Sequence, residues 1–445
     1  MTQVKSRSAT AMRKHTRDGG FLDILAFLIP CLQFVQLQVI GVINGSDLLL
    51  LGVFVFLALR MRIRISTPAG KWFMILCSLW LASQCVTDIV RRSALSDYAR
   101  GWSNIGMTLI NFAVLCTLLH GRPRRLVLFG WGLVAGSVLA YYINPNKYAE
   151  DYPWKFGVSY PITMAVLLLA SRSKCRGRWP VVLVTTIGLI NIYLGTRNTG
   201  AACLCAALYL QVTRYLQRKG AATPKLNTKV VVAIAASIIL GGVTILWAYK
   251  YAASRGILGE SAQVKYENQS SGQYGILLSG RKELLGSLSA IYDSPILGHG
   301  SWARDPIYLI EARQALAAMG YEDAWDMASD TLEEGYIPTH SYLLGAWVDA
   351  GIVGALFWGW IFVLTARTLM HVYARTVVLL PVAAFIAFLM LWDTLFSPYG
   401  GMARILMPYY LLTLMTCYSM VPYKAVPATI GATKRYIDAS SEPRP

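Results

Sequence analysis

Residues 377–395 read VVLLPVAAFIAFLMLWDTL, and Asp393 is the only charged residue among them. A transmembrane helix needs roughly 20 consecutive apolar residues, so this segment is long enough to cross a bilayer. Similar segments recur along the whole chain and predict an all-α polytopic membrane protein with about 12 transmembrane helices. The segments are residues 21–43, 48–60, 72–90, 101–120, 126–143, 156–171, 180–196, 200–216, 230–252, 341–366, 377–395 and 405–421.

The composition excludes most other classes of protein. Of the 445 residues, 55% are hydrophobic and only 14% are charged, whereas soluble domains carry about 25% charged residues. The same values exclude a disordered chain. The eight cysteines lie mostly inside the apolar segments, without the spacing of a zinc site or a disulfide framework. No DxD, HExxH or P-loop pattern lies in a fitting context, so we expect no metal and no nucleotide cofactor.

The formal net charge of +18 does not indicate nucleic-acid binding, because the basic residues form short clusters between the apolar segments. Such clusters indicate how the chain is oriented in the membrane. These clusters lie in every second connection, and the acidic residues concentrate in the others. By the positive-inside rule, the basic side is cytoplasmic. Both tails fall on that side, which requires an even number of spans. Residues 1–20 are basic and polar and lack the apolar region of a cleavable signal peptide.

One connection on the outer side, residues 253–340, is too long for a simple turn. Its periodicity predicts a helix over Arg281–Tyr292 and a second over Pro306–Met319, with the turn-rich segment Asp293–Gly300 between them. The expected organisation is an N-tail with helices 1–9 (1–252), an outer loop domain (253–340), helices 10–12 (341–421) and a C-tail (422–445).

His340 is a candidate general base, because it ends the outer loop and histidine accepts a proton near neutral pH. On a helix at 100° per residue, Gly351 lies about 20° from His340 and Gly354 about 40° to the other side. One helix face would then carry a base above small residues that allow close approach. The alternative is a helix-packing motif with an incidental interfacial histidine.

Arg197 and Arg281 are candidate anion ligands. Arg197 lies beside Thr and Asn where the eighth span begins, and a helix N-terminus attracts anions. Two guanidinium groups could hold a diphosphate. Each could instead be an arginine that reaches to the membrane surface. Arg100 and Arg404 could add positive potential at the outer end, and Asp88, Asp349 and Asp393 are weaker candidates near outer span ends.

Together these residues resemble the O-antigen ligase/polymerase superfamily of bacterial inner-membrane glycosyltransferases. The resemblance covers roughly residues 190–356 and extends to the span layout. It is carried by Thr196-Arg197, by Gly280-Arg281 followed by Asp293-Ser-Pro-Ile-Leu-Gly-His-Gly300, and by His340-Ser341 with Gly351 and Gly354.

The resemblance implies a metal-independent enzyme of the GT-C type in the bacterial inner membrane, with a periplasmic active site. It would transfer O-antigen glycan from undecaprenyl diphosphate to a sugar hydroxyl of lipid A–core oligosaccharide. His340 would be the base, and Arg197 and Arg281 would bind the diphosphate, while His299 would sit in a structural turn. The alternatives are an O-antigen or exopolysaccharide polymerase, a protein O-oligosaccharyltransferase, and a transporter of lipid-linked glycan that makes no bond.

Overall fold

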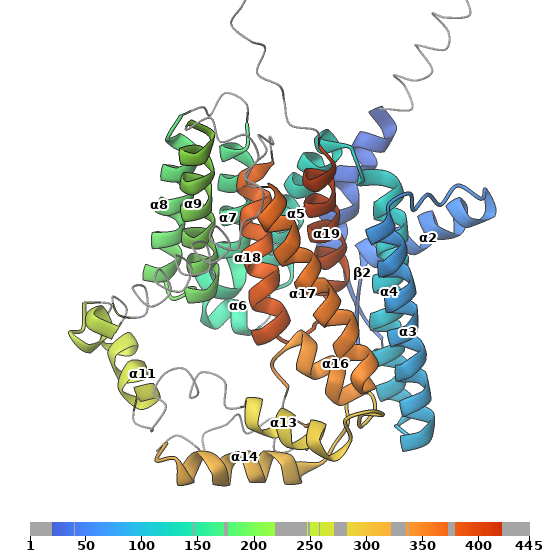
Figure 1. Cartoon of the computed structure of the whole chain (residues 1–445), viewed down its shortest axis with the longest axis vertical. Helices are drawn as coiled ribbons and strands as arrows, with labels where there is room; N and C mark the ends of the chain where they lie inside the picture. Colours follow the sequence, from blue (N-terminus) through green and yellow to red (C-terminus); the bar gives the residue numbers. More distant parts are fainter. Residues whose placement is uncertain are drawn as a thin grey trace, which may run out of the picture.

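The computed structural model describes residues 20–39, 41–145, 147–172, 177–218, 247, 250–257, 259–270, 283–321, 335–337, 339–372 and 379–420. Within these residues the chain is almost entirely helical, and the helices pack side by side into a bundle (Figure 1). Helices α13 and α14 lie together at one end of this bundle, and the C-terminal end of α19 lies at the other (Figure 1).

Residues 20–31 form the first helix, followed by a 3-10 turn at Leu32–Phe34. The helices of the bundle are α2 (Gly45–Leu59), α3 (Pro68–Arg91), α4 (Leu95–Leu119), α5 (Pro123–Ile143), α7 (Ser159–Ala170), α8 (Trp179–Tyr193), α9 (Arg197–Arg218), α16 (Tyr342–Ala350), α17 (Ile352–Val372), α18 (Leu380–Phe396) and α19 (Ala403–Ser419). Shorter elements are α6 (Lys147–Asp151) and the π-helix Pro153–Val158, and the outer connection contributes α11 (Glu260–Ser270), α13 (Glu283–Asp293) and α14 (Pro306–Ala318).

The architecture agrees with an all-α membrane protein. In the described part of the chain, α3, α4, α5 and α17 are long and apolar enough to cross a membrane. Shorter apolar helices include α2, α8 and α18. The ninth expected segment, 230–252, lies almost wholly outside the described residues, so the count of twelve spans remains a prediction. Figure 1 also shows α2 crosswise to α3 and α4 rather than alongside them.

The expectation that residues 21–43 form one apolar span was wrong. The chain leaves the helix near Phe34 and forms an antiparallel hairpin of β1 (Gln36–Gln38) and β2 (Val42–Asn44), with Gln36 opposite Asn44. The physical reason is the glutamines inside this segment. Gln33 is buried and donates to the Leu133 carbonyl at 3.0 Å, which ties the end of the helix to α5.

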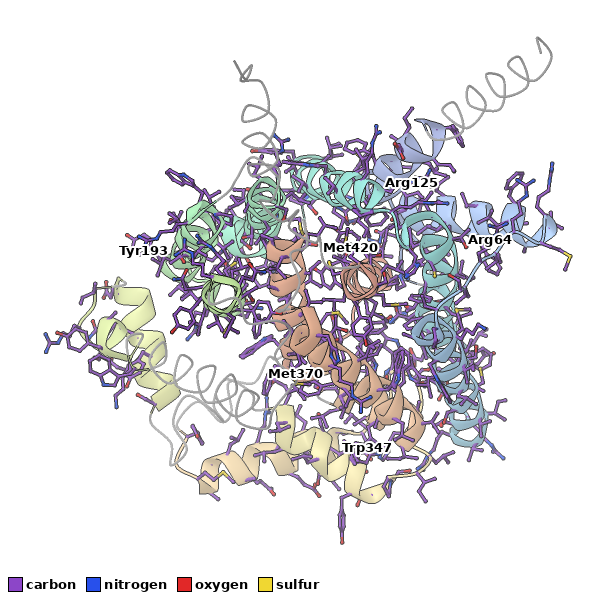
Figure 2. All side chains as sticks on the ribbon, turned by 45° about the horizontal axis from the view of Figure 1, so that its top comes forward. Arg64, Arg125, Tyr193, Trp347, Met370 and Met420 are labelled. Carbon is purple, nitrogen blue, oxygen red and sulfur yellow. The ribbon has the colours of Figure 1, made fainter. Side chains whose placement is uncertain are left out.

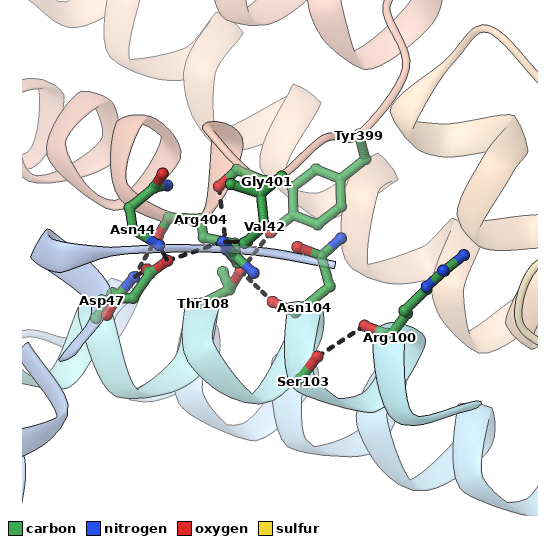
Figure 3. A network of polar contacts seen from close by, with 11 residues as sticks. Val42, Asn44, Asp47, Arg100, Ser103, Asn104, Thr108, Tyr399, Gly401 and Arg404 are labelled. Atoms are coloured by element: carbon green, nitrogen blue, oxygen red, sulfur yellow. Dashed lines mark hydrogen bonds and ion pairs between the residues drawn. The ribbon is translucent and has the colours of Figure 1, made fainter. Parts of the chain in front are cut away.

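A buried ion pair fixes the hairpin beside the bundle (Figure 3). Arg404, near the start of α19, contacts the Asp47 carboxylate at 2.8 Å, and it donates to the Val42 carbonyl at 2.8 Å. Asp47 also accepts from the Asn44 backbone, which caps α2. A charge inside a membrane domain is stable only when paired in this way. Arg404 therefore holds the hairpin, α2 and α19 together, and we do not include it in the candidate site.

Helices α18 and α19 form the centre of the bundle. Most of their side chains are buried, 11 of 17 in α18 and 14 of 17 in α19, which is expected of helices surrounded by other helices. Aromatic rings fill the space around them: Phe73 stacks on Phe112 with ring centroids 3.9 Å apart, and Trp80 stacks on Phe357 at 5.0 Å. These contacts join α3, α4 and α17 into one core.

The tenth span is not one continuous helix, so the helical-wheel argument that aligned His340 with Gly351 was wrong. Helix α16 ends at Ala350, and Gly351 adopts φ 69° and ψ −161° before α17 begins. The cause is a close approach by the turn between α13 and α14, which we call the outer turn. A Cβ on Gly351 would lie 1.9 Å from the Ile296 carbonyl oxygen in this turn. Only glycine fits such a position.

The turn between α13 and α14 is bonded to the end of α16 by its backbone. The His299 amide donates to the Val348 carbonyl at 2.7 Å, and the Gly300 amide donates to the Asp349 carbonyl at 3.0 Å. The Trp347 indole donates to the Pro295 carbonyl at 2.8 Å, and Figure 2 shows this side chain beside α13, at the far end of the molecule from Arg125. The outer turn thus occupies the break between α16 and α17.

We predict that Gly351→Ala prevents this docking, because the new Cβ would overlap the Ile296 carbonyl and require an unfavourable positive φ. We expect a loss of roughly 3 kcal/mol or more in unfolding free energy, as for other severe packing changes. Thermal unfolding in detergent measures it. Gly359→Ala in α17, the helix that begins directly after Gly351, is the control, since no atom lies within 4 Å of a Cβ there. Equal melting temperatures for the two variants would contradict the prediction.

Candidate functional site

The first part of the site is the start of α9, which lies where the sequence predicted a helix N-terminus. Helix α8 ends at Tyr193, Gly195 turns the chain with φ 84°, and α9 begins at Arg197. The Thr196 amide donates to the Asn191 carbonyl at 2.7 Å, which fixes the turn to the preceding helix. Arg197 is half-buried. A helix N-terminus with an arginine in its first turn favours an anion.

The second part is the segment just before α16. Ser341 caps the helix: its Oγ accepts from the Leu344 amide at 3.1 Å and donates to the Thr394 carbonyl at 2.9 Å. Both contacts are buried or partly buried, so they attach the start of α16 to α18. His340 is half-buried and directly precedes this cap. The serine that follows the histidine therefore sets the position of the candidate base.

A cavity of about 210 Å³ lies between these two parts. It has room for several molecules of water size, at about 30 Å³ each. Asn198 and Thr199 of α9 line it, as does Tyr342 at the start of α16. Among the described residues, the lining thus includes the two residues that follow Arg197 and the second residue after His340, rather than Arg197 and His340 themselves. The remaining lining residues come from α7, α17, α18 and α19: Tyr160, Trp358, Leu389, Met390, Asp393, Thr394, Leu406, Met407 and Tyr410.

Two buried polar groups at this place have no hydrogen-bond partner in the part of the chain that the structure describes. One is the Trp358 indole Nε1, on a lining residue, and the other is the Thr196 hydroxyl, one residue before Arg197. Both side chains are almost completely buried. An unsatisfied buried polar group costs roughly 1–3 kcal/mol. A substrate oxygen that accepts from these donors would remove that cost.

Among the polar side chains of the lining, the sequence analysis named Asp393 as a weaker candidate and missed the tyrosines Tyr160, Tyr342 and Tyr410. Tyr160 and Tyr410 form a hydrogen bond through their hydroxyls at 3.1 Å, and Asp393 accepts from Ser397 at 2.6 Å. A signal was available for Asp393, because it is the only charged residue in its apolar segment and such residues usually have a function. Tyr342 could have been found by its place two residues after His340.

Asp88 connects the outer turn to α3 and α4. Its Oδ1 accepts from the Ser301 amide at 2.6 Å and the Ser93 hydroxyl at 2.7 Å. Its Oδ2 accepts from the Ser301 hydroxyl at 2.7 Å and the Trp102 indole at 2.8 Å. The carboxylate is almost completely buried, and these donors replace its lost hydration. Asp88 is thus a structural anchor for the turn.

His299 has a structural role, as the resemblance implied. Its ring Nε2 donates to the Ala290 carbonyl at 2.7 Å, and its ring packs edge-on against Tyr308. Burial raises the pKa of Tyr308 to about 12, supported by its hydrogen bond to Asp293. The tyrosine therefore stays protonated at neutral pH and donates to Asp293. These contacts hold α13 against α14.

The other predicted residues lie in different surroundings. Arg281 lies outside the described residues. Gly354 allows close packing, because a Cβ there would lie 2.3 Å from the Ala346 carbonyl. Arg100 lies on α4 with its guanidinium 5.8 Å from the Trp302 ring, and Figure 3 shows it pointing away from the Arg404 network. Among the described residues, no group of three or more His, Cys, Asp or Glu side chains could hold a metal ion.

Comparison with protein families gives one relevant result. Residues 181–359 match the family model described as O-Antigen ligase. This segment contains Thr196-Arg197, the outer turn and the His340 motif, and the match confirms the resemblance to the O-antigen ligase superfamily. It supports a glycosyl-transfer function of the ligase or polymerase kind. Comparison with curated proteins and with solved structures gave no match.

We predict that Ser341→Ala costs about 1 kcal/mol of stability, as loss of an N-cap usually does, and also disorders the start of α16. Amide hydrogen exchange at Leu344 should become faster, because its acceptor is gone. The matched control is Thr67→Ala, which removes the cap of α3, where the Thr67 hydroxyl accepts from Gly70 at 3.1 Å. We expect a similar stability loss in both variants but reduced glycosyl transfer only in Ser341→Ala. Equal transfer rates would argue against a role of this cap in placing His340.

Proposed function

We propose that this chain is an O-antigen ligase, which joins a glycan carried on undecaprenyl diphosphate to a sugar hydroxyl of lipid A–core oligosaccharide. The observation that carries the proposal is the position of the cavity. Asn198 and Thr199, one and two residues after Arg197, line it from α9, and Tyr342 lines it two residues after His340. Residues that follow two family motifs far apart in the sequence therefore line one space, which supports a shared site.

The donor diphosphate would bind at the start of α9. Arg197, the N-terminal end of the α9 helix dipole and the buried Thr196 hydroxyl are all positive or donating groups. They suit the oxygens of a diphosphate, whose negative charge increases as it leaves the sugar. In this proposal Arg281, two residues before α13 in the sequence, supplies a second guanidinium.

The acceptor hydroxyl would be activated by His340. The imidazole takes the hydroxyl proton as the acceptor oxygen attacks the anomeric carbon, and the bond from that carbon to the diphosphate oxygen breaks. The electron pair leaves with the undecaprenyl diphosphate. A single displacement of this kind inverts the configuration at the anomeric carbon. No metal is required in this proposal if the arginines balance the charge of the leaving group.

The proposal includes a location and an orientation. The expected cytoplasmic ends and the outer loop fall at opposite ends of the bundle: the C-terminal end of α19 lies away from α13 and α14 (Figure 1). With the basic clusters in the cytoplasm, residues 253–340 form a periplasmic loop domain. The chain then sits in the bacterial inner membrane with its active site facing the periplasm.

A polymerase remains the second candidate, because it uses the same donor and the family match supports both. The serine after His340 and the spacing to Gly351 and Gly354 favour the ligase pattern. In this proposal the charged candidate residues cluster at the outer end, whereas transporters concentrate charges near the bilayer midplane. Transport is therefore the weakest alternative.

We predict that purified protein transfers glycan from undecaprenyl diphosphate to lipid A–core without ATP or divalent metal. His340→Ala should abolish detectable transfer, and Arg197→Ala or Arg281→Ala should lower the rate about 10²–10³-fold, by analogy with the loss of one donor to a developing anion. Arg62→Ala is the control, because this arginine is exposed in the connection between α2 and α3.

The products separate the candidate functions. Glycan on lipid A–core supports the ligase, and lengthened lipid-linked glycan would instead assign the chain as a polymerase. Folded protein that binds the donor and forms no bond with either acceptor would refute both enzymes.

A further inference from the structure

Two aromatic rings and two arginines form a connected group on the outer side of α4, outside the cavity. We call Arg100, Trp302, Arg304 and Tyr336 the Trp302 surface. The Trp302 and Tyr336 rings meet edge to face with centroids 5.8 Å apart. The Arg100 guanidinium lies 5.8 Å from the Trp302 ring centre, and the Arg304 guanidinium lies 5.0 Å from that of Tyr336. Each ring is therefore paired with a cation.

The backbone of Trp302 adopts an energetically unfavourable conformation. Its φ is 54°, in the left-handed region, which is a rare conformation for a bulky side chain. The ring is nevertheless 47% exposed, so burial does not repay the strain. The preceding residue, Ser301, is held by Asp88, which fixes the backbone in this conformation. A strained residue with an exposed aromatic ring is typical of a binding position.

The Trp302 surface continues toward His340. Arg304 and Tyr336 form an isolated antiparallel bridge, and the Ile337 amide donates to the Ala303 carbonyl at 3.0 Å. His340 is four steps along the chain from Tyr336, so their Cα atoms are at most about 14 Å apart. A short oligosaccharide can span such a distance while one of its hydroxyl groups reaches the histidine.

The charges of the surface favour an anionic ligand. The Arg304 guanidinium contacts Asp97 at 3.3 Å, and the Arg304 side chain is still 50% exposed whereas the Asp97 side chain is 6% exposed. Among the described residues, the Trp302 surface thus carries two guanidinium groups, of the exposed Arg304 and the half-buried Arg100, close to the buried Asp97 carboxylate. Guanidinium groups bind phosphate and carboxylate in pairs of hydrogen bonds, and flat aromatic rings stack on the apolar faces of sugars.

We propose that the Trp302 surface binds the oligosaccharide of the acceptor through an acidic sugar, phosphorylated or carboxylated, and so presents a neighbouring hydroxyl to His340. This inference rests on the proposed transfer function for the identity of the acceptor. The donor glycan is not the proposed ligand, because its reacting end is held at the start of α9 in the proposed function.

Lipid headgroups are the competing ligand, since Trp, Tyr and Arg are also common at membrane surfaces. Three observations favour an oligosaccharide. The rings contact each other and two cations instead of standing singly, the Trp302 backbone is strained, and the surface is joined by backbone hydrogen bonding to the segment that ends at His340.

The decisive variant is Trp302→Gly, because glycine accepts a positive φ without strain. It removes the ring while leaving the backbone conformation favourable, so the melting temperature should not fall. Deacylated lipid A–core oligosaccharide is the probe, and calorimetry with full-length protein in nanodiscs measures its binding. We expect at least about 10-fold weaker binding and an equally raised acceptor KM, with unchanged donor KM. Trp179→Ala is the control, since Trp179 is exposed at the start of α8.

A second comparison tests the acidic group. We expect wild-type protein to bind phosphatase-treated oligosaccharide more weakly than the phosphorylated form. Arg100→Gln should bind both forms about equally if the phosphate contacts this arginine. If the two forms also differ by the same factor in Arg100→Gln, this arginine does not recognise the phosphate and the proposal fails on that point.

The outcomes separate this inference from the proposed function. Oligosaccharide binding that Trp302→Gly weakens supports the surface even if wild-type protein shows no transfer, and that lack of transfer would refute the ligase alone. Unchanged oligosaccharide binding in Trp302→Gly overturns the surface, whatever the transfer assay shows. Weaker binding of the variant to anionic lipid vesicles, with oligosaccharide binding intact, would reassign the surface to lipid headgroups and overturn the proposal.

Discussion

The outer half of this molecule depends on one buried carboxylate. Asp88 lies on α3 and accepts hydrogen bonds from the backbone and hydroxyl of Ser301 and from Trp102 on α4. These bonds hold the outer turn against the bundle, and the outer turn fills the break at Gly351. A buried charge is costly unless such donors surround it. The same bonds that stabilise Asp88 therefore fix where the outer connection sits.

The position of the outer turn determines both candidate binding regions. On one side, its amides bond to the end of α16, whose other end carries the Ser341 cap and His340. On the other side, the residue after Ser301 is Trp302, whose ring belongs to the aromatic and arginine surface. A single turn thus connects the segment of the candidate base with the region proposed to hold the acceptor. Catalysis by proximity requires this kind of fixed relation between base and substrate.

Much of the fold could be predicted from the sequence, because long apolar segments have few structural options in a membrane. Helices α13 and α14 also begin and end close to their predicted residues. The break at Gly351 could not be predicted, since periodicity gives no sign that a distant carbonyl occupies the next turn. The hairpin at residues 36–44 was missed for a similar reason: Arg404, far along the chain, provides the partner for Asp47. In the site, Arg197 and His340 were identifiable by residue type, whereas the tyrosines and Trp358 became candidates only through the cavity that they share.

The interlocking of the outer turn with Gly351 has a consequence for protein engineering. Gly298 and Gly351 each adopt a positive φ, and a Cβ on either would overlap the backbone of the facing segment. A segment that is swapped between related proteins to make a chimera must therefore be longer than the outer connection. A chimera that takes residues from α13 to His340 from one protein would need α16 and the first turn of α17 from the same source. Substrate specificity would then be inherited together with this helical break.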